Sequence, residues 1–477
     1  MTRRRACALL LLGGAVAAVG CSVPCRITPA SMFACAGGVC ARHEAEIRCT
    51  KEFTIWPSFV ATGEHRIQLA AWPMDDRGRS RLVLVDPAGG GSVSARDFPR
   101  EAEQPVVVGD AGGSLHFLDT PHKSHVNQAI DFAPSDGDFR SEIVDQDKYQ
   151  ARFRSAAFGN NGTLYAAMTR EYGAAILATR TREGVWSKTE LRARQVNTVP
   201  GLGLSIDAAG VPYVAYLAAD DSRDFYVVAY HQGTGPRIVA QRRPQPWGLI
   251  THIRVASPLP GDAPHAPVIV FDKDSSILVE VPSAASSAEH GYRELSVPGI
   301  VPANDCKRPA ALGVAAQEVG HPCPTTIRCT EKGDTVLGHK LARTADGALW
   351  LVFMLWRVDR DVVWRTHEPE ISEVRTLGYC GADTIAERSF AELVVMRVVT
   401  GADARLEEAY HTPIARRQAE STPGMDMAAE GSSLHLFLGT GTEEDPIHYL
   451  VLDARELERA IRLKAPEPAK QVPPAGP

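Results

Sequence analysis

A short segment recurs along this chain at a regular interval. The stretch IDAAGVPYVAY (206–216) can be laid over FGNNGTLYAAM (158–168), which places Gly210 on Gly162, 48 residues earlier. In both copies an aromatic residue, Tyr213 in the first, follows the glycine by three positions. Related copies contain Gly113 with His116, Gly347 with Trp350, and Gly431. Because a fixed period makes each repeat one structural unit, the fold must consist of similar units packed side by side.

Each unit has the pattern of a tight turn followed by a buried strand. Asp207 and Gly210 are residue types that tolerate the backbone conformations of a chain reversal. The apolar run after the glycine predicts a buried strand. A polar turn and a second strand follow, at 80–86, 174–180, 224–230, 275–281, 361–367 and 447–453. Three or four antiparallel strands per repeat, without intervening amphipathic helices, predict an all-β fold of the β-propeller type.

The number of repeats predicts the number of blades. Seven strand cores can be counted, and they end near Trp72, Leu118, Met168, Tyr216, Phe271, Phe353 and Phe437. The last two intervals, of 82 and 84 residues, are longer than the earlier ones of 46–55 residues. They carry insertions, or an eighth blade lies near 391–399. We predict seven blades over 53–463, with six or eight blades, or a pair of β-sandwiches, as the alternatives.

The repeat resembles blades of the sialidase-like and BNR-repeat propellers, especially their noncatalytic relatives among bacterial lipoproteins. The resemblance is carried by LSIDAAGVPYVAY (204–216) and by the strand DFYVVAYHQG after it. The Asp-box of that family runs Ser-x-Asp-x-Gly-x-Thr-Trp. Ser205 and Asp207 match this box, but Gly210 comes one position late and Tyr213 stands where the box ends in tryptophan. The resemblance therefore implies the scaffold of the family without its chemistry.

Catalysis by a sialidase requires a group of arginines that clamps a carboxylate through bidentate hydrogen bonds. Arg66 and Ile67 are faintly similar to an Arg-Ile-Pro motif of the family, with Gln68 in place of the proline. The sequence does not select the remaining arginines among Arg152, Arg154, Arg254 and Arg343. Ordinary surface ion pairs are the simpler interpretation of these side chains. We therefore nominate no catalytic residue.

The N-terminal segment has the pattern of an export signal. Arg3, Arg4 and Arg5 precede an apolar stretch over 6–20, which is short for a membrane span. Small residues then precede Cys21, and this arrangement resembles the lipobox of bacterial lipoproteins, in which the cysteine is lipidated. The alternative is an ordinary cleaved signal peptide that leaves Cys21 for a disulfide. We expect a signal peptide over 1–20 and a lipid-anchored protein of the bacterial cell envelope.

The other cysteines agree with export. Apart from Cys7 and Cys21, eight cysteines form two local groups: Cys25, Cys35, Cys40 and Cys49, then Cys306, Cys323, Cys329 and Cys380. Even numbers in an exported chain predict disulfides, with three possible pairings within each group. Zinc binding is the alternative, but the chain has no CxxC motif. We expect the first group to form a small disulfide-rich spacer over 21–52.

Charge and composition restrict the partners. The formal net charge of −6 argues against nucleic-acid binding. After the export signal, no run of 18 apolar residues predicts a membrane span. The tail over 464–477 is rich in proline and lacks the residues to form a core, so we expect it to be disordered.

One cluster of side chains could hold a metal ion. Four side chains of this kind lie within ten residues, starting in the second predicted strand core: His116, Asp119, His122 and His125. Imidazole and carboxylate groups are ligands for divalent metals. A solvated loop that contains several histidines is the simpler interpretation, and we expect no cofactor.

These observations favour a binding or scaffold module over an enzyme. The expected partners are the membrane, through the lipid anchor, and a protein or glycan ligand. A glycan-acting hydrolase or lyase of the sialidase-like type is the alternative, and a structural part of the envelope is a third. An apolar channel would argue against the enzyme, whereas converging arginines or carboxylates would favour it.

Overall fold

The computed structural model describes most of the repeat region and part of the N-terminal segment. The described residues are 25–29, 33–49, 58–62, 66–71, 81–86, 92–97, 106–109, 115–120, 128–135, 138–146, 151–170, 175–191, 202–219, 225–242, 252–259, 266–273, 276–283, 291–301, 323, 325–367, 379–415, 424–439 and 447–464. Cys21, Gly113, His122, His125, Cys306 and the tail after residue 464 lie outside them.

Nearly all of the described chain is β-strand, and one helix follows the last strand. The elements are β1 (Cys25–Pro29), β2 (Phe33–Ala36), β3 (Val39–Cys49), β4 (Ser58–Thr62), β5 (Arg66–Ala71), β6 (Arg81–Asp86), β7 (Ser92–Asp97), β8 (Val106–Gly109), β9 (Leu115–Asp119), β10 (Gln128–Ser135), β11 (Asp138–Gln146), β12 (Ala151–Phe158), β13 (Leu164–Arg170), β14 (Ala175–Arg180), β15 (Trp186–Glu190), β16 (Leu202–Ile206), β17 (Pro212–Ala219), β18 (Phe225–His231), β19 (Gly235–Arg242), β20 (Ile253–Ala256), β21 (Val268–Lys273), β22 (Ser276–Pro282), β23 (Tyr292–Ser296), β24 (Ile327–Arg343), β25 (Leu349–His367), β26 (Tyr379–Val399), β27 (Arg405–Ala415), β28 (Gly424–Glu430), β29 (Ser433–Gly439), β30 (Ile447–Asp453) and α1 (Ala454–Lys464). No described helix has the length and apolar character needed to cross a membrane.

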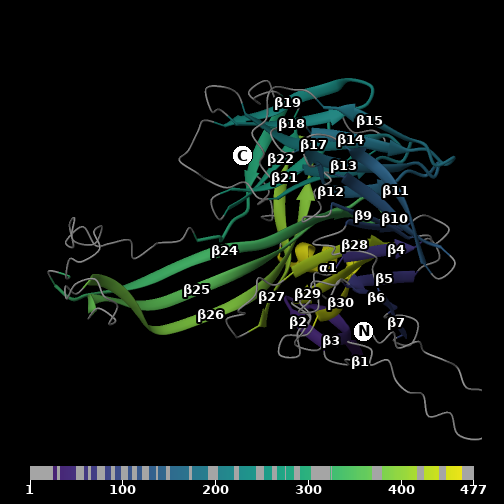
Figure 1. Cartoon of the computed structure of the whole chain (residues 1–477). Coiled ribbons are helices and arrows are strands. Elements are labelled where there is room, and N and C mark those ends of the chain that lie inside the picture. The colour runs from purple at the N-terminus through teal and green to yellow at the C-terminus, as the bar shows by residue number, and fades with distance from the viewer. Residues whose placement is uncertain are drawn as a thin grey trace, which may run out of the picture.

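The described strands form seven antiparallel sheets arranged as a closed ring (Figure 1). Six sheets have four strands in chain order, from β4–β7 to β24–β27, and the seventh runs β28–β29–β30–β3–β1 with β2 beside β3. The first strand of each sheet contacts the first strands of both neighbours, and β28 contacts β4. The chain is therefore a seven-bladed β-propeller, and the first strand of each blade lies nearest the axis. The segment 391–399 is part of β26 in the sixth blade, so it adds no eighth blade.

The apolar runs of the second strands are explained by burial on both faces. In β17, Tyr213, Ala215 and Leu217 pack in one core cluster with the fifth blade. The alternate residues, such as Val214 and Tyr216, pack in another cluster with the third blade. Because each face of a blade is covered by a neighbouring blade, the strand is apolar throughout instead of alternating with polar residues.

The repeated glycine closes the turn between the first and second strands. Gly210 has a φ of 81°, and its backbone N–H donates to the Asp207 carbonyl at 3.0 Å. The Asp207 carboxylate accepts hydrogen bonds from the backbone N–H groups of Ala209 and Val211 at 2.9 and 2.8 Å. Equivalent glycines with positive φ are Gly162, Gly347 and Gly431. The aspartate of the degenerate box thus organises a turn.

These turns also connect neighbouring blades. The Asn160 side chain of the third blade donates to the Ala208 carbonyl of the fourth at 3.1 Å. The backbone N–H of Ala345 in the sixth blade donates to the Gly431 carbonyl of the seventh at 2.8 Å. The repeated segment therefore contributes to the closure of the ring as well as to each blade.

Replacing Gly210 by alanine should destabilise the fold by about 1–2 kcal/mol, because an L-residue is unfavourable at this positive φ. Crowding should add little, since the nearest atom to an added Cβ is 4.0 Å away. Gly338→Ala is the control: its φ lies outside the left-handed region, and an added Cβ would meet nothing within 4 Å. Denaturant unfolding measures both, and equal losses in the two variants would contradict this account of the turn.

The N-terminal cysteine-rich segment is part of the propeller and is not a separate spacer. Strand β3 pairs with β30, the third strand of the last blade, from Arg42 opposite Val451 to Ile47 opposite Ile447. The prediction of a spacer over 21–52 was therefore wrong for β1–β3. The physical reason is that the C-terminal part of the chain supplies only three strands to the last blade, so the edge of β30 would be unpaired without a strand from the other end of the chain.

Both groups of cysteines contain a disulfide, as predicted. Cys35 is bonded to Cys40 across the β2–β3 hairpin, and Cys25 lies directly opposite Cys49 in the β1–β3 ladder. In the second group, Cys323 is bonded to Cys380. Cys329 is also disulfide-bonded. These five disulfide-bonded residues leave no thiolates for the zinc alternative at their positions.

The long interval before the last blade is an extension of the sixth blade. Strand β27 pairs with β26 only from Ala391 onward, and the outer parts of β24, β25 and β26 continue as a three-stranded arm (Figure 1). The predicted separate strand at 361–367 is wrong, because it is the end of β25. The sequence between the two halves, MLWRVDRD (354–361), lacks the glycine, proline or asparagine that would favour a turn.

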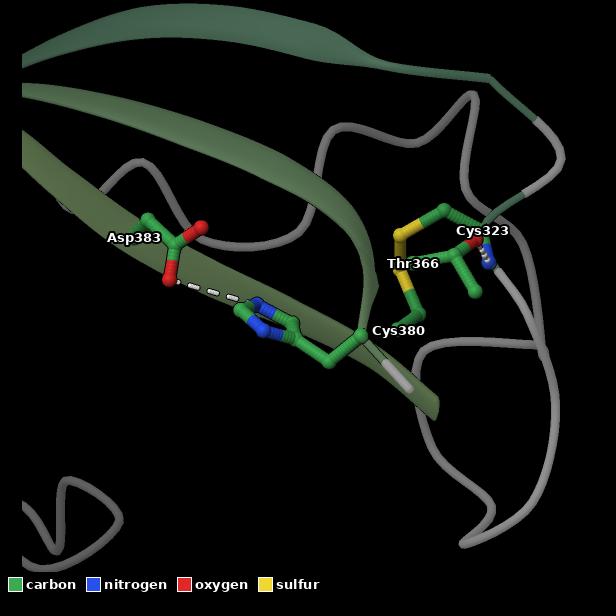
Figure 2. The surroundings of a disulfide bond; sticks show 5 residues. Cys323, Thr366, Cys380 and Asp383 are labelled. Carbon is green, nitrogen blue, oxygen red and sulfur yellow. Dashed lines mark hydrogen bonds and ion pairs between the residues drawn. A yellow bond between two sulfur atoms is a disulfide. The ribbon is translucent and has the colours of Figure 1, made fainter. Parts of the chain in front are cut away.

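A disulfide and ion pairs hold the arm together. Figure 2 shows the Cys323–Cys380 bond beside Thr366, whose hydroxyl accepts a hydrogen bond from the Cys323 backbone N–H at 3.0 Å. Cross-strand ion pairs follow along the arm: Lys332–Asp359, Arg357–Asp334, Arg360–Glu387 and Arg365–Asp383. Alternating charges therefore stabilise strands that have no further blade beside them.

Candidate functional site

Charged side chains gather on the axial strands of the fifth, sixth and seventh blades. Arg254 lies on β20, His339 and Lys340 on β24, and Asp426 on β28. The Lys340 ammonium lies 2.6 Å from the Asp426 carboxylate and so connects the sixth blade to the seventh. Both side chains keep some exposure, 24% for Lys340 and 16% for Asp426. We call these four residues, together with His252 and Asp272, the axial cluster.

His252 and Asp272 form the part of the cluster that belongs to the fifth blade. The Asp272 carboxylate accepts a hydrogen bond from the His252 backbone N–H at 2.7 Å. The His252 ring Nδ1 lies 3.4 Å from the other oxygen of the same carboxylate. The ring centroids of His252 and His339 are 6.1 Å apart with their planes almost perpendicular. The cluster therefore spans the axial part of the fifth, sixth and seventh blades.

His339 is the most buried member, with 1% of its surface exposed. Within the described residues neither of its ring nitrogens has a hydrogen-bond partner. The nearby Val270 backbone opposes the effect of burial on the pKa of the ring only weakly. Burial, followed by the positive charge of Arg254, lowers the pKa of His339 to about 3. The ring is therefore neutral at physiological pH, and both of its nitrogens are buried.

This burial makes the stability of the propeller depend on pH. The pKa of His339 is lower in the folded chain than in the unfolded one, so the unfolded chain binds the proton first as the pH falls. We expect the free energy of unfolding to decrease below about pH 6.5, by about 2 kcal/mol at pH 5. In the variant His339→Gln this contribution should be absent. Denaturant unfolding at pH 7 and pH 5 tests it, and an unchanged pH dependence in the variant would refute the assignment to His339.

Among the described residues, the charged groups around the two cations of the cluster offset the effect of their burial only in part. Burial lowers the pKa of Arg254, and the carboxylates of Asp426 and Asp272 offset this only in part. Burial also lowers the pKa of Lys340, which Asp426 raises and Arg254 lowers further. An added negative charge would therefore stabilise both cations.

There is also space beside them. Gly338 precedes Lys340 by two residues on β24 and so faces the same side of the strand. A Cβ placed on Gly338 would meet nothing within 4 Å. The arrangement can thus accept an anionic group. One terminal nitrogen of Arg254 donates to the Ile253 carbonyl at 2.9 Å, and the remaining N–H groups of the guanidinium are donors for a carboxylate.

The arginines considered as a sialidase clamp have different surroundings. Arg343 donates to the carbonyls of Ser257 and Gly347, both at 2.9 Å, and so holds the turn of the sixth blade. Arg154 donates to the Thr169 hydroxyl at 3.1 Å beside β13. Of the four arginines, Arg254 alone is a member of the axial cluster. The side chain of Arg66 lies outside the described residues.

The candidate metal ligands are only partly described. Nδ1 of the buried His116 lies 2.9 Å from the Asp131 carboxylate of the neighbouring strand β10, and Asp119 is buried at the end of β9. Groups of metal-ligating side chains were not found in the part of the chain that the structure describes. His116 thus has a structural partner, and the metal site as a whole stays a prediction.

One further concavity lies between the fourth and fifth blades. It has a volume of about 370 Å³ and is lined by Tyr213, His231, Arg237 and Pro267, among others. Tyr213, singled out in the repeat, is 3% exposed and packs mainly in the core. This concavity contains none of the axial residues.

Arg254 was predicted from the sequence only as one of several candidate arginines, and the other members of the axial cluster were not predicted. A usable signal existed in VLGHKLA (336–342), where two polar residues interrupt an otherwise apolar strand. Burying such residues is costly unless they are paired, so they indicate either a satisfied network or a site.

Known proteins resemble this chain only distantly. No protein-family model matches the chain, and no curated protein matches it. A periplasmic gluconolactonase of Pseudomonas aeruginosa is 11% identical, with a TM-score of 0.36, and the match covers 79% of this chain and 96% of that one. A polysaccharide lyase is 9% identical, with a TM-score of 0.39 and coverages of 83% and 89%. The Aleuria aurantia lectin is 12% identical, with a TM-score of 0.36 and coverages of 71% and 96%. At these values no activity is transferred to this chain.

Proposed function

We propose that this protein is an exported, lipid-anchored propeller that binds a carboxylate-bearing ligand at the bacterial cell envelope. The observation that carries the proposal is the axial cluster, where Arg254 and Lys340 are incompletely compensated beside open space. A carboxylate would accept hydrogen bonds from the guanidinium and lie near the ammonium. Acidic glycans and acidic peptides both offer this group.

Binding is favoured over catalysis by the state of the two carboxylates. Asp426 is paired with Lys340, and Asp272 accepts a hydrogen bond from the His252 backbone. Hydrolysis by paired carboxylates needs one acid and one base placed on either side of a bond. A glycan-acting enzyme of the sialidase-like type is the second candidate, because two carboxylates lie close enough to Arg254 to affect its pKa.

A glycan array with the mature chain tests the proposal and separates the candidates. We expect the protein to bind glycans that contain uronic acids and not to bind the corresponding neutral glycans. An acidic peptide series in solution distinguishes the second source of carboxylates. Binding that does not depend on a carboxylate would refute the proposal, and release of shortened products from bound glycans would favour the enzyme.

The lipid anchor has a separate test. We expect cells fed labelled palmitate to incorporate the label into the wild-type protein and not into Cys21→Ala, because the thiol of Cys21 would carry the lipid. Cys7→Ala is the matched control, since Cys7 lies within the predicted signal peptide. Label in the Cys21→Ala protein, or none in the wild type, would contradict the anchor.

A further inference from the structure

Helix α1 is fixed on the outside of the ring in one orientation. Its residues Ala454, Leu457 and Ala460 are buried in the core cluster between the sixth and seventh blades. The Asp453 carboxylate caps the helix by accepting a hydrogen bond from the Arg455 backbone N–H at 2.8 Å. Because one face is packed, the opposite face is presented to the surroundings.

That outward face carries a line of arginines. Arg455, Arg459 and Arg462 are exposed and are spaced by four and three residues, which places them along one side of the helix. In the described residues none of the three has an ion-pair partner, whereas Glu458 pairs with Arg397 and Lys464 with Glu408. We call the three residues the arginine stripe.

The stripe places like charges on consecutive turns of the helix. Like charges at this spacing destabilise a helix by about 0.2–0.5 kcal/mol per pair. Beside the stripe lies Leu463, with 76% of its surface exposed. Arginines next to an exposed leucine are the arrangement of helices that lie on a membrane surface, where the cations contact anionic headgroups and the apolar side chain enters the interface.

The position of the helix agrees with such a surface. Helix α1 directly follows β30, which belongs to the same sheet as β1. Cys21 precedes β1 by four residues, a distance of at most about 14 Å in an extended chain. The lipid and the stripe would thus lie on the same blade. Only this argument from position rests on the proposed lipid anchor.

We propose that the arginine stripe of α1 docks on an anionic phospholipid surface. This contact is separate from the lipid on Cys21 and from ligand binding at the axial cluster. A single acyl chain gives weak and reversible membrane attachment, so a second, electrostatic contact would strengthen it. Each arginine near an anionic surface contributes about a fivefold increase in binding.

Vesicle sedimentation with the chain from residue 22 onward tests the proposal, because this chain holds every described element and lacks the lipid. Vesicles of phosphatidylcholine are compared with vesicles that also contain phosphatidylglycerol, at low and at physiological ionic strength. We expect binding only to the anionic vesicles, weakened by salt. The variant R455Q/R459Q/R462Q should lose about tenfold or more of this binding.

The matched control is R182Q/R293Q/R388Q, which removes three exposed arginines elsewhere and changes the net charge equally. It should bind the anionic vesicles as the parent chain does. Absence of binding to anionic vesicles, or equal losses in both variants, would overturn the proposal. Circular dichroism of each variant verifies that α1 and the sheets remain folded. Failure of the palmitate labelling would leave this result unaffected, since the assay uses no lipidated protein.

Discussion

Deletion of residues 22–50 should prevent the propeller from closing. The deletion removes β3, which pairs with β30, and with it three buried side chains: Val39, Ala41 and Ala45. A buried valine contributes about 1.5–3 kcal/mol, and each lost backbone hydrogen bond costs about 1 kcal/mol. The total of about 5 kcal/mol or more is comparable with the whole stability of an ordinary domain.

Thermal unfolding followed by circular dichroism measures this effect. We expect a decrease in the midpoint of about 10 °C or more, or failure to fold. Deletion of residues 465–477 is the control, because it removes no described element and should leave the midpoint unchanged. If the chain without residues 22–50 unfolded at the same temperature as the parent, the N-terminal strand would not be needed for closure.

The blades could be predicted from the sequence because their second strands are apolar over their whole length. A run such as PYVAYLA (212–218) is covered by a neighbouring blade on each face, so the pattern is strong and recurs. The turn residues Asp207 and Gly210 added a second, independent signal at the same period. Local patterns of this kind can be recognised in the sequence without knowledge of the long-range contacts of the fold.

The closure of the ring could not be predicted in the same way. Strand β3, VCARHEAEIRC, mixes charged and apolar residues, because it lies near the outer edge of its blade. Its partner β30 lies about 400 residues later in the chain, and no local pattern encodes such a pairing. The arm was not predicted, because the outer part of β25 has the composition of an independent strand and no local pattern shows that it continues the inner part.

The axial cluster was missed because its members are distributed over three blades. His339 and Lys340 are adjacent in sequence, but Arg254 and Asp426 come from strands more than 80 residues away. Their proximity follows only from the ring, which brings the first strands of all blades to one axis. Charged residues within first strands are therefore the signal to look for in other chains of this architecture.

Replacing Arg254 by glutamine should remove most of the affinity for a carboxylate-bearing ligand. Glutamine keeps one N–H donor group but loses the charge and the bidentate geometry. A charge-assisted hydrogen bond contributes about 1.5–3 kcal/mol, which corresponds to a loss of about 10- to 100-fold in affinity. Arg182→Gln, an exposed position in a turn of the third blade, is the matched control and should bind as the parent does.

Isothermal titration calorimetry of these proteins with a uronic-acid oligosaccharide selected on the array tests whether the axial cluster binds the carboxylate. We expect tight binding by the parent and by Arg182→Gln, and binding at least tenfold weaker by Arg254→Gln, with circular dichroism unchanged. Equal affinities in all three proteins would contradict it, because the ligand would then lie away from the axial cluster.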